Sequence, residues 1–165
     1  MRNFILFVAL LLSSSCAINH GKPIANLKYL GVDRYLDRNI YQVRFTSDVD
    51  VVDLFKSKIS QALICSFGDD FDFSVSHAMD VYGEGSIESV VSSKNPEFRA
   101  DVLFFERKDA TSEKVLDSEG LKSRLLGREF LVCKVRVNSY SYKVYLSEEM
   151  RLPVADLLRE IEKFK

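Results

Sequence analysis

Hydrophobic and polar residues alternate along several stretches of the chain, a pattern typical of strands with one buried face. The stretches are 41–45, 71–81, 98–104, 131–137 and 140–146. Residues 27–32 are expected to pair with the first stretch. Gly83 and Gly85 are expected to end the second stretch. With a two-residue turn at Asn138-Ser139, the last two stretches form a hairpin that pairs Val137 with Tyr140 and Leu131 with Leu146.

Three other segments carry apolar residues at helical spacing. The first, 48–66, follows Ser47, which is a favourable residue for capping a helix. The second is a short helix around 121–126, and the third begins at Pro153 and continues to position 161, with Glu160 on its polar face. The order of these elements predicts an α+β fold: a mostly antiparallel sheet of about five strands with two or three helices packed on one face.

The composition fits one soluble domain over residues 27–165. The chain has 165 residues, of which 47% are hydrophobic and 28% are charged. Lys and Arg total 23 against 24 Asp and Glu, so the chain has no excess of positive charge for binding nucleic acid. We therefore expect no nucleic-acid partner.

The amino terminus has the three-part layout of a secretory signal. Arg2 supplies a positive start, Phe4 to Leu12 form an unbroken apolar run, and small residues follow. The run is nine residues long, about half of the ~20 that a stable membrane-spanning helix needs. A retained transmembrane anchor is therefore not expected.

The sequence Leu12-Ser13-Ser14-Ser15-Cys16 resembles the lipobox of bacterial lipoproteins, with its leucine one residue further from the cysteine than is usual in that family. The resemblance implies removal of residues 1–15 and attachment of a diacylglycerol to Cys16, with 16–26 as a tether. Ala17, in place of aspartate, resembles lipoproteins sorted to the outer membrane, and the domain would then lie in the periplasm of the bacterial cell envelope. Cleavage after Ala17, giving a secreted or soluble periplasmic protein, is the alternative.

The cysteine count agrees with export. Of three cysteines, Cys65 and Cys133 remain as an even pair once Cys16 carries lipid. In an oxidising compartment they are expected to form a disulfide. The alternative is two buried free thiols that pack as small apolar residues.

Candidate chemistry is sparse. The acids Asp69, Asp70 and Asp72 do not have the spacing of a calcium loop, and the glycines at 83 and 85 lack the lysine of a phosphate-binding loop. A thiolate–base pair of Cys65 and His77 is conceivable, but no third, orienting residue is indicated. We expect no catalytic residue, no metal site and no cofactor.

Tyrosines gather near the C-terminal hairpin, and tyrosine is enriched at protein interfaces. The expected register places Phe130, Val132 and Tyr145 together on its outward face. They form a candidate partner-binding patch, and the alternative is a second buried layer or a covering loop.

Three functions remain open. The first is a non-catalytic exported lipoprotein that binds a protein partner in the cell envelope, as an assembly factor, pilot or accessory subunit. The second is an immunity protein or inhibitor of a periplasmic enzyme. The third is a small hydrolase that uses Cys65.

Overall fold

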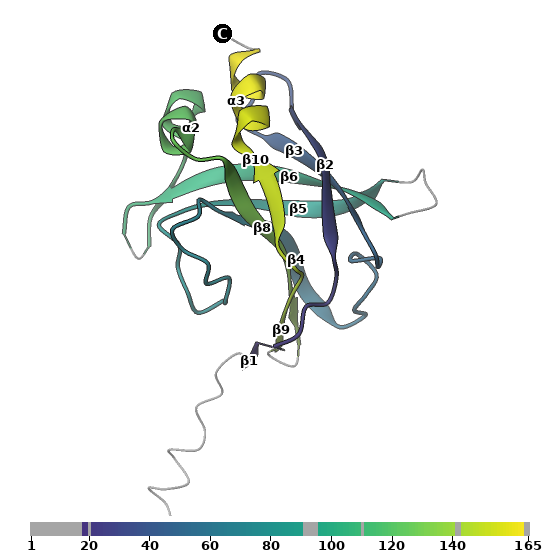
Figure 1. The fold of residues 1–165 in the computed structure, drawn as a ribbon. Helices are drawn as coiled ribbons and strands as arrows, with labels where there is room; N and C mark the ends of the chain where they lie inside the picture. The colour runs from purple at the N-terminus through teal and green to yellow at the C-terminus, as the bar shows by residue number, and fades with distance from the viewer. Residues whose placement is uncertain (1–17, 20, 91–95, 110, 141–142, 164–165) are drawn as a thin grey trace, which may run out of the picture.

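The computed structural model describes residues 18–19, 21–90, 96–109, 111–140 and 143–163. Within them the chain forms a ten-stranded, mostly antiparallel sheet and two short helices, α2 and α3, which lie at one end of the molecule (Figure 1). The strands are β1 (Ile18–Asn19), β2 (Leu27–Arg34), β3 (Tyr41–Ser47), β4 (Lys58–Ser66), β5 (Val81–Val90), β6 (Glu97–Arg107), β7 (Glu113–Val115), β8 (Phe130–Ser139), β9 (Lys143–Leu146) and β10 (Met150–Pro153). The helices are α2 (Ser118–Leu125) and α3 (Val154–Glu162). The prediction of about five strands with helices over one face is therefore wrong.

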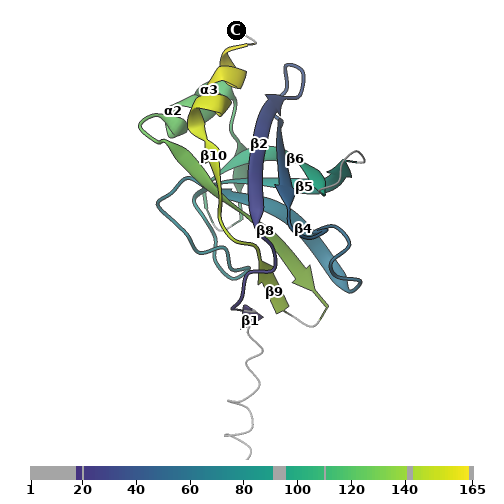
Figure 2. The same ribbon diagram turned by 45° about the vertical axis from the view of Figure 1, so that its right-hand side comes forward.

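The strands follow the order β1-β9-β8-β4-β5-β6-β3-β2, while β10 also pairs with β8 and β7 with β6. The sheet curls until its two ends meet (Figure 2). The backbone amide of Ile24 donates to the carbonyl of Leu146 at 2.9 Å, and the amide of Glu148 donates to the carbonyl of Ala25 at 2.8 Å. A sheet curled in this way can bury one face without a layer of helices.

The main core lies inside the curl. Aromatic rings from neighbouring strands pack there, for example Phe45 with Phe98 and Tyr41 with Phe104, each pair with ring centroids 5.6 Å apart. The largest fully buried side chains of this core are Tyr41, Phe45, Phe98, Phe104, Leu63, Leu121, Leu125, Leu131, Leu152, Leu157 and Ile161. Leu121 and Leu125 of α2, with Leu157 and Ile161 of α3, belong to this core, so the helices close the curled sheet at one end.

Several predicted elements are confirmed. The 27–32 stretch pairs antiparallel with 41–45 as β2 and β3, and the 98–104 stretch lies in β6. The short helix and the final helix are α2 and α3, and Pro153 is the N-cap residue of α3. Glu160 differs from its prediction: it is buried and accepts hydrogen bonds from the Arg34 amide and the Lys163 ammonium.

The predicted helix over 48–66 is wrong. Asp50 does cap backbone amides, those of Val52 and Asp53, but only a turn follows and the chain enters β4 at Lys58. The second half of β4 is buried on both faces, because Leu63 belongs to the main core and Ile64 to a second cluster. A strand buried on both faces loses the alternation that would distinguish it from a helix.

The predicted strand over 71–81 is also wrong, because most of this stretch lies in the loop that joins β4 to β5. Carboxylates of Asp70 and Asp72 accept hydrogen bonds from the amides of Asp72 and Ser74, two residues further on in each case. Aspartate side chains that bond their own backbone in this way form turns and compete with sheet ladders. The glycines expected to end this strand instead lie inside β5.

The hairpin forms with a different register. Leu146 pairs with Arg136, five residues beyond its predicted partner Leu131. Leu131 pairs instead with Leu152 of β10, a strand that the sequence analysis missed. Because the displacement is odd, the side chains of β9 lie on the opposite faces from those predicted.

Candidate functional site

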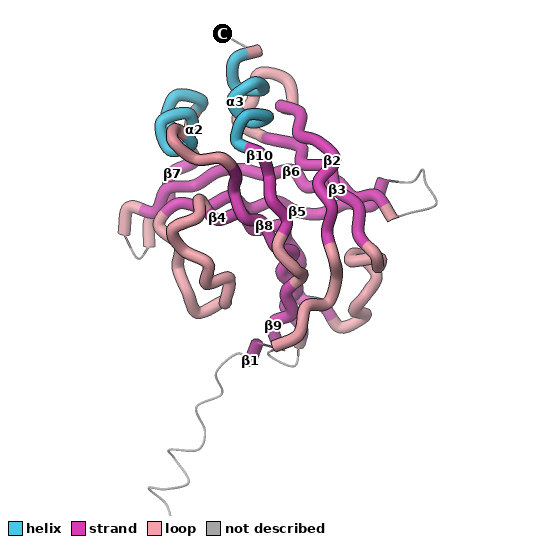
Figure 3. The backbone as a smooth tube through the Cα atoms, viewed as in Figure 1, coloured by secondary structure: helices cyan, strands magenta, loops and turns pink. Residues whose placement is uncertain are grey.

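The candidate site lies on the 67–80 loop, which joins β4 to β5 (pink in Figure 3). It crosses the outer face of the sheet and buries a second hydrophobic cluster. Phe73 and Met79 come from the loop, whereas Ile64 and Val132 come from β4 and β8. Packing of these four side chains stabilises the loop against the sheet.

Two arginines hold the ends of the loop. Arg128 donates to the Phe67 carbonyl and to the Asp69 carboxylate, and Arg107 donates to the Met79 carbonyl at 3.3 Å. A guanidinium can bond several acceptors at fixed angles, so one arginine restrains both backbone and side chain.

His77 links the two arms of the loop. Its Nε2 atom bonds the Asp70 carboxylate, and its Nδ1 atom lies 3.8 Å from a carboxylate oxygen of Asp72. The hydrogen bond with Asp70 raises the pKa of His77, and the same bond lowers the pKa of Asp70. The pair is therefore an imidazolium–carboxylate contact at mildly acidic pH.

Two cavities flank this contact. One, of about 150 Å³, lies between the loop and the sheet and is lined among others by His77, Tyr82, Arg107 and Arg136. The other, of about 470 Å³, lies toward α2 and is lined among others by Asp70, Asp80, Arg124 and Arg128. In the smaller one, burial and a hydrogen bond to Glu113 raise the pKa of Tyr82 to about 12, so its hydroxyl stays protonated.

The arrangement supports binding better than proton transfer. A general base needs a ring nitrogen that can reach substrate, whereas both nitrogens of His77 face carboxylates of its own loop. Ser74 and Ser76 bond one another at 3.4 Å. Among the described residues, no group of three or more His, Cys, Asp or Glu side chains is placed to hold a metal ion.

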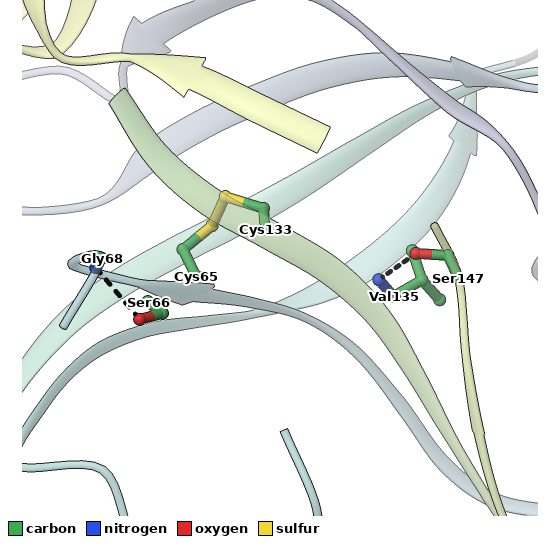
Figure 4. Close-up of a disulfide and its surroundings, with 6 residues drawn as sticks. All are labelled: Cys65, Ser66, Gly68, Cys133, Val135 and Ser147. Atoms are coloured by element: carbon green, nitrogen blue, oxygen red, sulfur yellow. Dashed lines mark hydrogen bonds between the residues drawn. A yellow bond between two sulfur atoms is a disulfide. The ribbon is translucent and has the colours of Figure 1, made fainter. Parts of the chain in front are cut away.

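The predicted disulfide is formed. Cys65 of β4 and Cys133 of β8 occupy paired positions on adjacent strands and are fully buried (Figure 4). The sulfur of Cys65 is thus bonded, and His77 lies on the loop over the opposite face of the sheet. The structure does not bring these two residues together as a thiolate and a base, and a bonded Cys65 has no free thiol to act as the nucleophile of a hydrolase.

The candidate partner patch is not assembled. Val132 is buried beneath the 67–80 loop and Phe130 packs beside it, with the Arg151 guanidinium 4.4 Å from the Phe130 ring centroid. Tyr145 lies on the other face of the sheet and stacks on Phe55, with ring centroids 4.3 Å apart. A covering loop, the alternative to a partner site, accounts for Val132.

The sequence analysis missed the exposed apolar side chains of the same loop. Phe71 is 55% exposed and Val75 is 49% exposed, whereas the strand predicted over 71–81 places both on its buried face. The acids next to Phe71 give the only signal in the sequence, since they favour turns over strands.

Cys16 and residues 1–15 lie outside the described residues. The predicted tether is described at 18–19 and 21–26, where it is not a free linker, because β1 pairs with β9 and Asn26 bonds Asp48. No helix among the described residues is long and apolar enough to cross a membrane.

The chain matches no protein-family model, no curated protein and no solved structure.

Proposed function

We propose that the chain is an exported lipoprotein, anchored through Cys16, whose domain binds a protein partner in the cell envelope and does no chemistry. The observation that carries the proposal is the buried Cys65–Cys133 disulfide. Disulfides form and persist in oxidising compartments and are rare in the cytosol, so the bond agrees with the signal-like start of the chain.

The partner-binding surface in this proposal is the exposed side of the 67–80 loop. Phe71 and Val75 project about half of their surface to solvent, while the loop that carries them is held by Arg128, Arg107 and the His77–Asp70 contact. Exposed apolar side chains on a restrained loop cost little conformational entropy when they bind. Assembly factors, pilots and accessory subunits are the roles that fit such a surface.

Export and lipidation are tested first. In cells grown with labelled palmitate, the wild-type protein is expected to carry label and the Cys16→Ala variant to lose it. An unlabelled wild-type protein, or label that persists in the variant, contradicts the anchor.

Partner binding is tested by crosslinking in intact envelopes. Phe71→Ser is expected to lose the crosslinked species that the wild type forms. Leu126→Ser is the matched control, because Leu126 is 65% exposed but lies beside α2. Equal crosslinking by the two variants contradicts a role for the loop.

One observation favours an inhibitor or immunity protein as the second candidate. The side chains of Asp69 and Asp72, on either side of Phe71, are 78% and 57% exposed. Carboxylates around an apolar side chain complement the basic cleft of an enzyme that acts on a polyanion. In that case the crosslinked species is a single enzyme whose activity falls when it binds this chain, and Asp72→Asn weakens the inhibition.

A further inference from the structure

The end of the molecule opposite the helices carries a second exposed surface, which adjoins the 67–80 loop: Ile59 and Lys143 line a cavity of about 250 Å³ together with Val75. In Figures 1 and 2, β1 and β9 lie at this end and α2 and α3 lie at the other. The turn after β8 and the start of β4 lie here too, because Lys58 pairs with Ser139 and the Tyr140 amide donates to the Ser57 carbonyl at 3.1 Å. We name this surface the β9 end; its residues are 52–59, Tyr140 and 143–145.

The position of β1 limits how far a lipid on Cys16 can lie from the β9 end. Ile18 pairs with Lys143 in the parallel β1–β9 ladder, and Cys16 precedes Ile18 by two residues. Two residues span at most about 7 Å when fully extended. The headgroup layer of one leaflet is about 5–7 Å thick, so lipid attached at Cys16 would hold Ile18 and the start of β9 close to the headgroups.

The β9 end presents apolar side chains to this boundary. Tyr140 is 70% exposed, Ile59 is 58% exposed and Leu54 is 38% exposed. Tyrosine is enriched at membrane–water interfaces because its ring is apolar and its hydroxyl is polar. Leu54 and Ile59 lack a polar tip, so the headgroup layer is a better environment for them than water.

Lysines flank these apolar side chains. Lys56 and Lys143 are both exposed, one on the loop before β4 and the other at the start of β9. Long lysine side chains can cover apolar surface while the ammonium reaches lipid phosphates. Lys58 adds a third positive charge, and Asp50 and Asp53 on the same loop offset two of the three, so the net charge is only +1 and apolar contact is the main contribution.

We infer that the β9 end rests in the headgroup layer of the bilayer, with Tyr140, Ile59 and Leu54 as its contacts. The inference builds on the proposed lipidation of Cys16 and adds an orientation: α2 and α3 point away from the membrane. The domain is then held at the lipid surface in one pose instead of moving on a tether.

The chain contains no tryptophan, so one substitution supplies a unique fluorescent reporter. Lipidated Tyr140→Trp protein is reconstituted into phosphatidylethanolamine–phosphatidylglycerol vesicles, with and without brominated acyl chains as quenchers. We expect a blue-shifted emission and loss of most of it to the brominated lipid. Leu126→Trp, at the helical end, is the control and is expected to show neither change.

Failure of this inference and failure of lipidation give different results. If the protein floats with vesicles but Tyr140→Trp behaves like Leu126→Trp, the orientation is wrong and the anchor stands. If native protein carries no lipid, a chain that begins at Cys16 is produced without the leader and coupled at Cys16 to a maleimide phospholipid. Cys16 is then the only free thiol, since the chain has three cysteines and two of them are bonded. The same quenching measurement on this conjugate supports or overturns the orientation.

Discussion

The Cys65–Cys133 disulfide connects the strand before the 67–80 loop to β8, and its removal is expected to cost a large part of the stability of the domain. The two cysteines are paired across adjacent antiparallel strands in the main core, and neither is exposed to solvent. The perturbation is the double variant Cys65→Ala/Cys133→Ala, which removes the bond without leaving a lone thiol.

The size of the effect follows from the loop that the bond closes. The cysteines are separated by 68 positions in the sequence. In the chain-entropy model, a closed loop of this length restricts the unfolded chain by about 4 kcal/mol at 25 °C. Domains of this size unfold with a free energy of about 5–15 kcal/mol, so the loss is a substantial fraction of the total.

The assay is urea unfolding at neutral pH, followed by tyrosine fluorescence, for oxidised protein and for protein that has been reduced and alkylated. We expect the free energy of unfolding of the double variant to fall by about 4 kcal/mol, and that of the reduced protein by at least as much. Val135→Ala is the matched control. Val135 is buried on the same face of β8, so its truncation removes core contacts and leaves the bond intact.

The prediction is wrong if intact mass shows the bond to be reduced while the free energy of unfolding changes by less than about 0.5 kcal/mol, a difference within the usual range of a surface substitution. It is also wrong if reduction lowers the free energy of unfolding of Val135→Ala by less than it lowers that of the wild type, because both proteins contain the same bond. That result would place the stabilisation in side-chain packing and not in the covalent link.

Three further predictions concern the loop, the sheet and the core. The bond to Asp70 raises the pKa of His77 and lowers that of Asp70. Amide protection in the 67–80 loop, which is the intrinsic exchange rate at each pH divided by the observed rate, should therefore be greatest between about pH 4 and pH 6.5. It should fall as pH rises through the raised His77 pKa or falls through the lowered Asp70 pKa, and His77→Asn should lose this profile. Gly85→Ala should lower the free energy of unfolding in urea by about 1–3 kcal/mol, because a Cβ there would lie 2.5 Å from the Asp101 carbonyl oxygen. Leu157→Ala, at a fully buried position of α3, should lower it by about 2–5 kcal/mol, again measured in urea.

Strands with one solvent-exposed face were the most predictable part of the fold. In β3 and β6, buried residues alternate with partly exposed ones, and the alternation in the sequence is the same. The pairing of β2 with β3 needed no long-range information, since the strands are neighbours in the chain. Helix α3 was equally clear, because Pro153 marks its start and its apolar residues recur at helical spacing.

Elements whose environment depends on distant segments were not predictable. β4 looks helical because Ile64 is covered by the 67–80 loop, which no local pattern reveals. The glycines of β5 looked like a break, but Gly83 allows β5 to pack closely against Phe104 of β6, where a Cβ would lie 2.7 Å from the ring. In both cases the signal came from a neighbour in space.

Two errors dispersed the candidate partner patch: the hairpin register moved Tyr145 to the other face of the sheet, and the loop covered Val132. Residues 71–81, interpreted as a strand, would have extended the sheet and left Val132 facing solvent. As a loop, the segment crosses the sheet and carries Phe73 and Met79 onto Val132. The buried residues of the outer face thus form a second, smaller core, and the proposed partner surface consists of the side chains that the loop leaves outside. Phe71 therefore replaces Val132 as the residue whose substitution best tests binding, because changing Val132 would loosen the loop as well as any interface.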